Sequence, residues 1–463
     1  SNYLNAFAGG LVAEASEVSY IDGSEADAQI IGGKSEQRLQ SYFGRVNLNI
    51  SDKYLFMGSL RRDGTSLFVK GNRYKTYPGL SFGWIVSRED FFGGAGVLNF
   101  MKFRASWGQA GSLSGVLPGA GQPSIGFGYR VYDGAGNAIT VGESSELSNP
   151  DLTWETGEQT NIGIDFGLME DRLTVSVDWF NKLTKDLITT SAAPEYIGNS
   201  APLFNAGTMS NKGLEFELAY KNRYNALKYQ ASLNLTSLKN EVTEINGGLG
   251  AIPASQNARV GTSWIPTVFE QGQPAWYFKG YQTNGLDDNG NLVYVDTDEN
   301  GMINEEDQTY IGDPHPDFIY GGAVNLEFKN FDFTVFVQGQ IGNDILVGYL
   351  REDRATQNRP TYFNDADFFA PTLSAGNTLR SDKMIFDGGF TRIKQIQIGY
   401  NLQEAIKGFT NFRVYASLED YFTFTKYNGL EPEIGSTFND ALGIDRGVYP
   451  NAGRILVGAS VNF

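Results

Sequence analysis

The last ten residues of the chain, RILVGASVNF (454–463), decide the fold. In an extended strand successive side chains point to opposite faces, so every second residue shares a face. One face of this stretch is wholly apolar and the other is mostly small or polar. The apolar positions are Ile455, Val457, Ala459, Val461 and Phe463. About ten residues is the length of a tilted strand that crosses a membrane. We therefore predict that this stretch is the closing strand of a transmembrane β-barrel.

The composition of the 463 residues agrees with a barrel and excludes several other classes. No cysteine is present, so there is no disulfide framework, no Cys-ligated zinc and no thiol nucleophile. The net charge of −17 argues against a nucleic-acid partner, which would attract Lys and Arg. No run of about 18 uncharged apolar residues occurs, so a helical membrane span is not expected. The 56 glycines and 13% aromatic residues suit many strands, many turns and two aromatic girdles.

The same alternation recurs upstream from about residue 37, separated by connections of two lengths. Short turns fall near 51–53, 168–171 and 329–330, whereas long loops cover about 110–157, 239–317, 342–389 and 424–452. Short periplasmic turns and long extracellular loops are the layout of outer-membrane barrels. Including a weaker segment near residues 3–12, we expect about 14 antiparallel strands, with residues 1–463 forming part of one all-β barrel domain.

Charged side chains occupy the polar face of several predicted strands. They are Lys102, Arg104, Asp165, Asp178, Glu215 and Glu217. On a lipid-facing surface each basic one would cost roughly 2–4 kcal/mol at the membrane midplane. These residues are therefore expected to face inward. A lumen this polar is typical of a wide barrel, because narrow barrels fill their interior with packed side chains.

Several stretches resemble the SusC branch of the TonB-dependent outer-membrane transporters of Bacteroidetes (the SusC/RagA family). They are SYFGRVN (41–47), RRDGTS (61–66), NPDLTWET (149–156), NAGTMSNKGLE (205–215), GDPHPDF (312–318) and YNGLEPE (427–433). They occur in the family's order from about residue 38 to the end. The terminal Phe463 also resembles the signal that is read by the barrel-assembly machinery of outer membranes.

The resemblance implies a barrel of about 22 strands, of which this chain would supply the C-terminal part. The N-terminal plug of the family is not in this chain. Because lipid does not tolerate open sheet edges, a second polypeptide or an N-terminal part is expected to complete the barrel.

The function implied by the resemblance is import of oligosaccharides or peptides across the outer membrane of a Gram-negative bacterium. A SusD-like surface lipoprotein would serve as the lid, and TonB–ExbB–ExbD would act through the plug region. The whole would be a dimer of transporter–lipoprotein pairs in outer-membrane lipid, with no enzymatic activity. Two alternatives remain open, namely a passive porin of large diameter and a surface scaffold or anchor barrel.

Catalytic chemistry has little support in the sequence. The only histidine, His315, lies between Pro314 and Pro316 and is expected in a rigid turn at the barrel rim. Without a second histidine or a cysteine, a nucleophile–base–orienter set is not visible. We expect no enzyme.

The segment DTDENGMINEED (296–307) has the spacing of a calcium-binding EF-hand loop. Asp296, Asp298 and Asn300 stand at positions 1, 3 and 5, Gly301 at position 6, Met302 offers a backbone carbonyl at position 7, and Asp307 stands at position 12. The flanking helices of an EF-hand are absent. We predict a structural Ca²⁺ site in an extracellular loop; the alternative is an acidic loop with an Asn-Gly turn.

Aromatic residues in the predicted loops have two readings. They are Trp264, Trp276, Tyr277, Tyr349, Tyr362 and Phe363. They could stack on sugars or peptide side chains, or pack against neighbouring loops. A second group, Tyr42, Phe100, Tyr400 and Phe463, is expected in the aromatic girdles at the two membrane interfaces.

Overall fold

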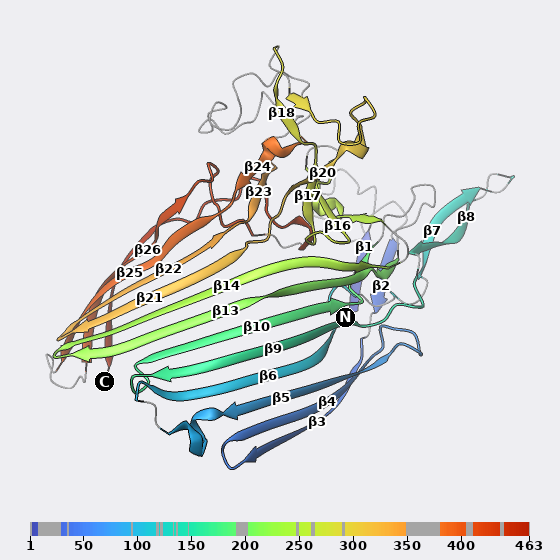
Figure 1. The fold of residues 1–463 in the computed structure, drawn as a ribbon. Helices are drawn as coiled ribbons and strands as arrows, with labels where there is room; N and C mark the ends of the chain where they lie inside the picture. Colours follow the sequence, from blue (N-terminus) through green and yellow to red (C-terminus); the bar gives the residue numbers. More distant parts are fainter. Residues whose placement is uncertain are drawn as a thin grey trace, which may run out of the picture.

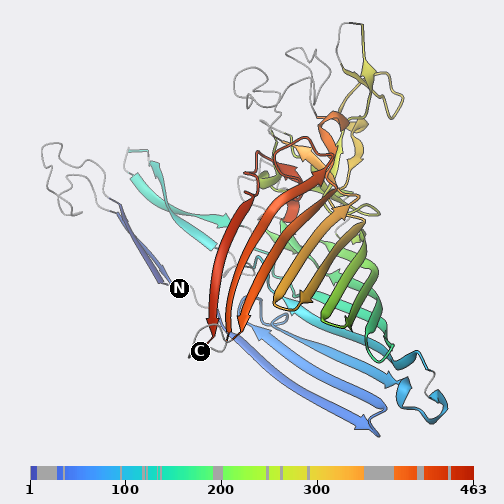
Figure 2. The same ribbon diagram turned by 90° about the vertical axis from the view of Figure 1, so that its left-hand side faces the viewer.

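One antiparallel sheet of thirteen strands dominates the computed structural model (Figures 1 and 2). The structure describes residues 2–7, 29–34, 37–93, 96–116, 120, 124–132, 134–135, 138–146, 148–190, 202–246, 250–260, 264–288, 292–348, 380–403, 411–435 and 439–462. Each strand of the sheet pairs with the strand of the same sheet that comes next along the chain. The strands are β3 (Leu39–Ile50), β4 (Tyr54–Thr65), β5 (Tyr74–Ile85), β6 (Leu98–Ser112), β9 (Glu155–Leu168), β10 (Leu173–Lys185), β13 (Gly207–Tyr224), β14 (Leu227–Ile245), β21 (Phe318–Phe328), β22 (Phe331–Ile341), β25 (Phe390–Gln403), β26 (Asn411–Thr425) and β28 (Arg454–Asn462).

Tight turns at one end of the sheet fix the register of the hairpins. Lys329 adopts a left-handed conformation with φ 54° between β21 and β22, which pair from Phe328 and Phe331 onward. Ser51 and Asp52 do the same between β3 and β4. Left-handed residues give a short hairpin turn the twist that matches the right-handed twist of the flanking strands. The predicted short turns near 51–53, 168–171 and 329–330 all lie at this end of the sheet, which is called here the turn end.

The strand count differs from the expected number by one. The weak first segment does form a strand, β1 (Asn2–Phe7), but it pairs with β2 (Gln29–Lys34) in a separate two-stranded sheet. A nearby partner in sequence takes up its hydrogen bonds, so it does not join the wall. The prediction of this segment as a wall strand is wrong.

The long loops at the opposite end, the loop end, carry secondary structure of their own (Figure 1). A four-stranded sheet contains β15 (Ala251–Pro253), β16 (Thr267–Glu270), β17 (Tyr277–Gly280) and β20 (Thr309–Gly312). A three-stranded sheet contains β23 (Asp344–Val347), β24 (Ile385–Asp387) and β27 (Ile444–Asp445). Three hairpins add β7 (Ser124–Tyr132) with β8 (Ala138–Glu146), β11 (Ile188–Thr190) with β12 (Leu203–Asn205), and β18 (Thr283–Leu286) with β19 (Leu292–Tyr294). Together, the described residues of 250–316, 342–348, 380–389 and 426–453 are called the loop cap.

Buried apolar side chains gather in the loops and not along the large sheet. Most residues of the main buried clusters lie at the loop end of the sheet. By contrast, apolar strand residues such as Leu80 and Val457 are 61% and 83% exposed. An apolar sheet face of this extent requires lipid as its solvent. Among the described residues no helix is long and apolar enough to cross a membrane.

Candidate functional site: the inner wall and the loop cap

The register of the ladders separates the two faces of the large sheet. Val457 pairs with Ala416, and Leu80 pairs with Trp107, so apolar residues lie opposite one another from strand to strand. Lys102 pairs with Asp165, and Asp178 pairs with Glu215, on the other face. The charged strand residues predicted to face inward therefore lie on one shared surface, called here the inner wall.

Arg104 is the centre of an ion cluster on the inner wall that spans three strands. Its Nη2 lies 2.7 Å from Asp165 Oδ1 on β9 and 2.8 Å from Asp178 Oδ2 on β10, and its Nε donates to Asp165 Oδ2 at 2.8 Å. Ser176 donates to Asp165 at 2.8 Å. Gly163 makes this reach possible, because a Cβ there would lie 2.1 Å from Asp178 Oδ1.

A second cluster repeats this arrangement near the C-terminus. Arg413 on β26 donates from Nε to Asp332 Oδ2 on β22 at 3.1 Å, and Asn401 donates to the same carboxylate at 2.9 Å. Gly399 lies on the strand between them, and a Cβ there would meet Asp332 Oδ2 at 2.4 Å. In both clusters an arginine and an aspartate on two strands form an ion pair across the strand between them. That strand has a glycine, which has no side chain, at the crossing point.

A groove of about 710 Å³ follows the inner wall toward the turn end. Its polar lining includes Lys102, Asp165, Ser176, Glu217 and Asn234. Phe100 also lines it, because it lies two residues before Lys102 on the same face and pairs with Gly167. The prediction of Phe100 as a girdle residue is therefore wrong.

The other girdle predictions lie on the outer face where the structure describes them. Tyr42 pairs with Arg62 near the loop end and is 60% exposed. Tyr400 pairs with Phe331 near the turn end, and their ring centroids are 4.7 Å apart. Phe463 lies outside the described residues.

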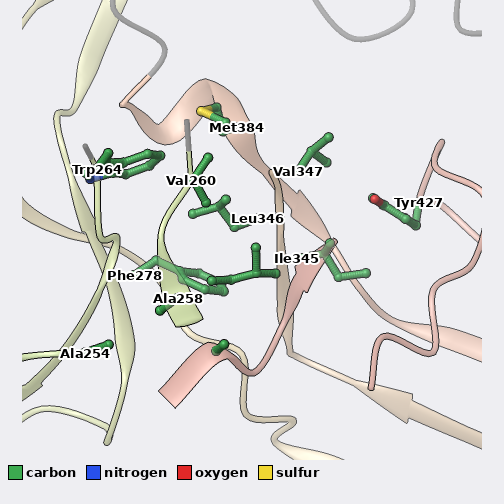
Figure 3. Close-up of a cluster of buried hydrophobic side chains, with 12 residues drawn as sticks. Ala254, Ala258, Val260, Trp264, Phe278, Ile345, Leu346, Val347, Met384 and Tyr427 are labelled. Atoms are coloured by element: carbon green, nitrogen blue, oxygen red, sulfur yellow. The ribbon is translucent and has the colours of Figure 1, made fainter. Parts of the chain in front are cut away.

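The largest buried cluster holds the loop cap together (Figure 3). Trp264, Phe278, Leu346 and Met384 come from separate segments and meet in it. Leu346 and Val347 of β23 also pair in parallel with Ile444 and Asp445 of β27. The loops therefore form one packed body and not independent arms.

The loop aromatics mostly serve this packing. Trp264 is 5% exposed and Tyr277 is 2% exposed. Burial raises the pKa of Tyr277, and its hydroxyl donates to Glu270 at 2.5 Å. The rings of Trp276 and Phe269 lie 5.4 Å apart. Tyr349, Tyr362 and Phe363 lie outside the described residues. The described loop aromatics Trp264, Trp276 and Tyr277 therefore pack against neighbouring loop residues.

Arg392 anchors the last loop onto the inner wall. It is 2% exposed, and its guanidinium contacts Glu431, donates to Glu433 Oε2 at 2.7 Å and donates to Thr423 at 2.9 Å. Glu431 is itself 3% exposed and accepts from the backbone of Asn451 at 2.9 Å. A paired buried charge of this kind ties Glu431 and the backbone at Asn451 to β25.

Sequence reasoning missed this anchor. The stretch YNGLEPE (427–433) resembles a family motif, but that resemblance predicts no role for its glutamates. Glu431 lies 39 residues after Arg392, and no local periodicity connects them. The one available signal was a basic residue on the inward-facing side at the start of a strand, since a buried charge requires a carboxylate from elsewhere.

The acidic loop 296–307 brings three of its predicted ligands together. One carboxylate oxygen from each of Asp296, Asp298 and Asp307 lies within 4.8 Å of the others. Gly301 has φ 84° and donates its N–H to Asp296 Oδ2 at 2.7 Å. Asn300 donates its N–H to Asp298 Oδ1 at 3.1 Å. Carboxylates this close repel one another unless protons or a cation offset their charge.

The remaining predicted ligands are arranged differently. The Asn300 side chain donates to Asp298 at 2.7 Å and accepts the Met302 N–H at 2.8 Å, so its oxygen is turned away from the carboxylates. The Met302 side chain is 65% exposed. Asp307 is fully buried, and the backbone N–H of Asn304, opposed in part by desolvation, lowers its pKa. The donor set matches the oxygen ligands that Ca²⁺ prefers.

His315 lies in the last turn of the loop cap, just before β21, as expected. Its Nδ1 lies 2.7 Å from Asp313 Oδ1, and its backbone N–H donates to the same oxygen at 2.9 Å. Nearby, burial and the charges of other aspartates raise the pKa of Asp344, whose carboxylate accepts the Asp313 N–H at 2.9 Å. These contacts fix the turn.

Comparison with known proteins agrees with this architecture. The sequence model of the family described as "TonB dependent receptor-like, beta-barrel" matches residues 14–318. TonB-dependent receptor P3 of Formosa agariphila is 30% identical over 99% of this chain and 49% of its own length. TonB-dependent receptor SusC of Bacteroides thetaiotaomicron is 30% identical over 92% of this chain and 44% of its own length. The chain thus spans about half the length of the curated relatives it matches.

The fold is also found in a solved structure. The RagAB peptide importer in its "open-open" state superposes with a TM-score of 0.77 and 20% identity, covering 95% of this chain and 48% of that chain. The chain belongs to the TonB-dependent receptor-like β-barrel family, and its large sheet is part of the wall of an outer-membrane barrel.

Proposed function

We propose that this chain is the C-terminal wall and loop cap of a SusC-like, TonB-dependent importer of oligosaccharides or peptides. The observation that carries the proposal is the pairing of a charged inner wall with an apolar outer face beneath a packed loop cap. A wall of this kind suits a wide, water-filled or protein-filled lumen. The structural likeness to the RagAB peptide importer supports peptides as cargo, and the likeness to the TonB-dependent receptor SusC supports the dependence on TonB.

The partners follow from the same proposal. A SusD-like lipoprotein would close over the loop cap, and TonB–ExbB–ExbD would act through a plug region outside this chain. The exposed edges of β3 and β28 would pair with the remaining barrel strands, because unpaired backbone groups are not tolerated in lipid. Two transporter–lipoprotein pairs would form the complete dimer.

Two measurements test the proposal, namely the subunit composition of the isolated complex and the growth of a deletion strain. We would tag the full-length transporter, isolate it in mild detergent, and determine the mass and peptide map of each subunit. In parallel, a deletion strain would be grown on a panel of polysaccharides and peptides, beside a strain that lacks TonB. The importer predicts a lipoprotein in the complex and loss of growth on one polymer in both strains.

The alternatives give other outcomes. A passive porin would keep its uptake in the strain without TonB. A surface scaffold would retain its partners, yet its deletion would leave growth on every polymer unchanged. Either result would overturn the importer proposal.

We further propose that residues 296–307 bind Ca²⁺ as a structural ion. The convergence of Asp296, Asp298 and Asp307 supports this proposal, as does the left-handed Gly301 that closes the loop. Bound Ca²⁺ would supply positive charge for carboxylates that otherwise accept hydrogen bonds from backbone N–H groups and from the side chains of Thr297 and Asn300.

Limited proteolysis of outer-membrane vesicles tests the ion. We expect Ca²⁺ to protect the loop from cleavage and a chelator to remove the protection. Asp298→Asn should lose the protection, whereas Glu299→Gln, one residue away and exposed, should keep it. Equal cleavage of the wild-type loop with and without Ca²⁺ would contradict the site.

A further inference from the structure

A polar group interrupts the apolar outer face of the barrel at the loop end of β3, β4 and β5. Arg62 pairs with Tyr42 on one side and with Thr76 on the other, so all three share the outer face. Below them toward the turn end, the same face carries Leu60, 56% exposed, and then Val46 and Leu80. Arg62 therefore lies just beyond the apolar band, at the depth where lipid headgroups begin.

The side chains around Arg62 form a hydrogen-bonded frame. Tyr74 donates its hydroxyl to Gln40 at 2.8 Å, and the Gln40 amide donates to the Tyr42 hydroxyl at 2.6 Å. The Arg62 guanidinium lies over the Tyr74 ring, 5.4 Å from its centroid. Gly64 admits this arrangement, since a Cβ there would lie 2.3 Å from the Tyr74 ring.

The charge of Arg62 is not neutralised by the protein that the structure describes. The outward-facing basic residues of the regular strand pairs are Arg62, Lys185, Lys212 and Lys239. Lys185 lies 3.0 Å from Glu158, and Lys212 and Lys239 lie 3.9 and 3.6 Å from Glu241. Among the described residues, no carboxylate lies within ion-pair distance of Arg62.

We propose that Arg62, framed by Gln40, Tyr42 and Tyr74, binds a phosphate group carried by a lipid of the outer leaflet. A guanidinium offers two parallel N–H donors to a phosphate, and the Tyr74 ring holds it in place. The apolar residues directly below would contact the acyl chains of the same lipid. A free phosphate offers the same headgroup chemistry but no acyl chains.

Native mass spectrometry of the full-length transporter in a non-ionic detergent tests the proposal. The probe is lipid A with one phosphate, compared with the same lipid after removal of that phosphate. We expect Arg62→Gln to weaken binding of the phosphorylated lipid about tenfold, and Arg62→Lys to weaken it less, since the charge remains while the planar fork is lost. The dephosphorylated lipid should bind wild type and Arg62→Gln equally weakly.

Lys239→Gln is the matched control, because it removes one positive charge from the same face at a residue that already has a carboxylate neighbour. We expect it to bind as wild type does. Equal binding of the phosphorylated lipid by wild type and Arg62→Gln would overturn the proposal. An equal loss of binding in Arg62→Gln and Lys239→Gln would overturn it as well. Displacement of the lipid by millimolar inorganic phosphate would overturn the lipid as the source of the group. Heat-dependent mobility on gels confirms that each variant is folded.

Discussion

The guanidinium of Arg104 lies 2.8 Å from the carboxylate of Asp178, although a whole strand separates them. The gap is closed because Gly163, on the strand between, has no side chain to intervene. Arg413 and Asp332 meet across Gly399 in the same way. In both places a glycine lets charge on the inner wall be neutralised laterally within the sheet.

Replacing this glycine should therefore destabilise the barrel. Gly163→Ala places a methyl group 2.1 Å from Asp178 Oδ1, so the ion cluster must separate. We expect a loss of about 1–3 kcal/mol in the free energy of unfolding, measured by urea titration of the full-length protein in micelles. Gly44→Ala is the control, since nothing lies within 4 Å of its Cβ. Equal stability of the two variants would refute the role of Gly163.

Loss of Arg392 should release the last loop from the wall. Arg392→Gln leaves the 3% exposed Glu431 without its cation, which costs about 3–5 kcal/mol for a buried pair. We expect faster hydrogen exchange and proteolysis within residues 427–451, with the strands of the sheet unchanged. Adding Glu431→Gln should restore part of the protection. Lys426→Gln, which changes an 88% exposed side chain, should have no effect.

Acid should weaken the contact between Glu89 and the turn end of the sheet. The hydroxyl of Tyr54, then the Trp84 indole and Lys53, lower the pKa of Glu89 to about 2 from its usual 4.5. Its stabilising contribution is therefore complete above pH 4.5 and disappears as the pH falls toward 2.

Glu89→Gln reports this effect directly. The urea midpoint of the variant should lie below that of wild type at pH 7, and the gap should shrink at pH 3. Asp90→Asn, at a fully exposed neighbour 3.6 Å from Lys53, is the control and should show a much smaller change with pH. A gap for Glu89→Gln that is constant with pH would argue against the contact.

Asp344 should behave in the opposite sense. Burial first, and then the charges of Asp313, Asp387 and Asp317, raise its pKa, so its ionised form opposes folding of the loop cap. Asp344→Asn is expected to slow hydrogen exchange of β23 at pH 7, and the advantage should shrink as the pH falls through the raised pKa of the wild type. Asp288→Asn, at an exposed position of the cap, is the control. Faster exchange in Asp344→Asn at pH 7 would contradict this account.

Period-two alternation was sufficient to predict the wall. Leu80, Phe82 and Trp84 recur at every second position and share the outer face, whereas the charged Arg104 lies on the inner wall, because apolar side chains face lipid and charged ones face the interior. Phe100 was misplaced although the same alternation puts it on the inner wall, because it lies two residues before Lys102. The face of a strand residue is set by the period of two and not by its residue type.

The loop cap could be predicted only in outline. The spacing of residues 296–307 predicted that Asp296, Asp298 and Asp307 would converge, because a twelve-residue loop is a local feature. The pairing of Arg392 with Glu431 depends on where two distant segments meet, which no local pattern encodes. The orientation of the Asn300 side chain likewise depends on neighbours within hydrogen-bond distance, and not on its position in the motif.

The parallel pairing of Leu346 with Ile444 also sets an order of events during biosynthesis. Residues 344–347 are synthesised almost one hundred residues before their partner strand β27. The three-stranded sheet of the loop cap therefore cannot form before residues 444–445 are available, and β25 and β26 precede these residues in the chain. An ordered three-stranded sheet thus shows that the chain has been delivered as far as β27.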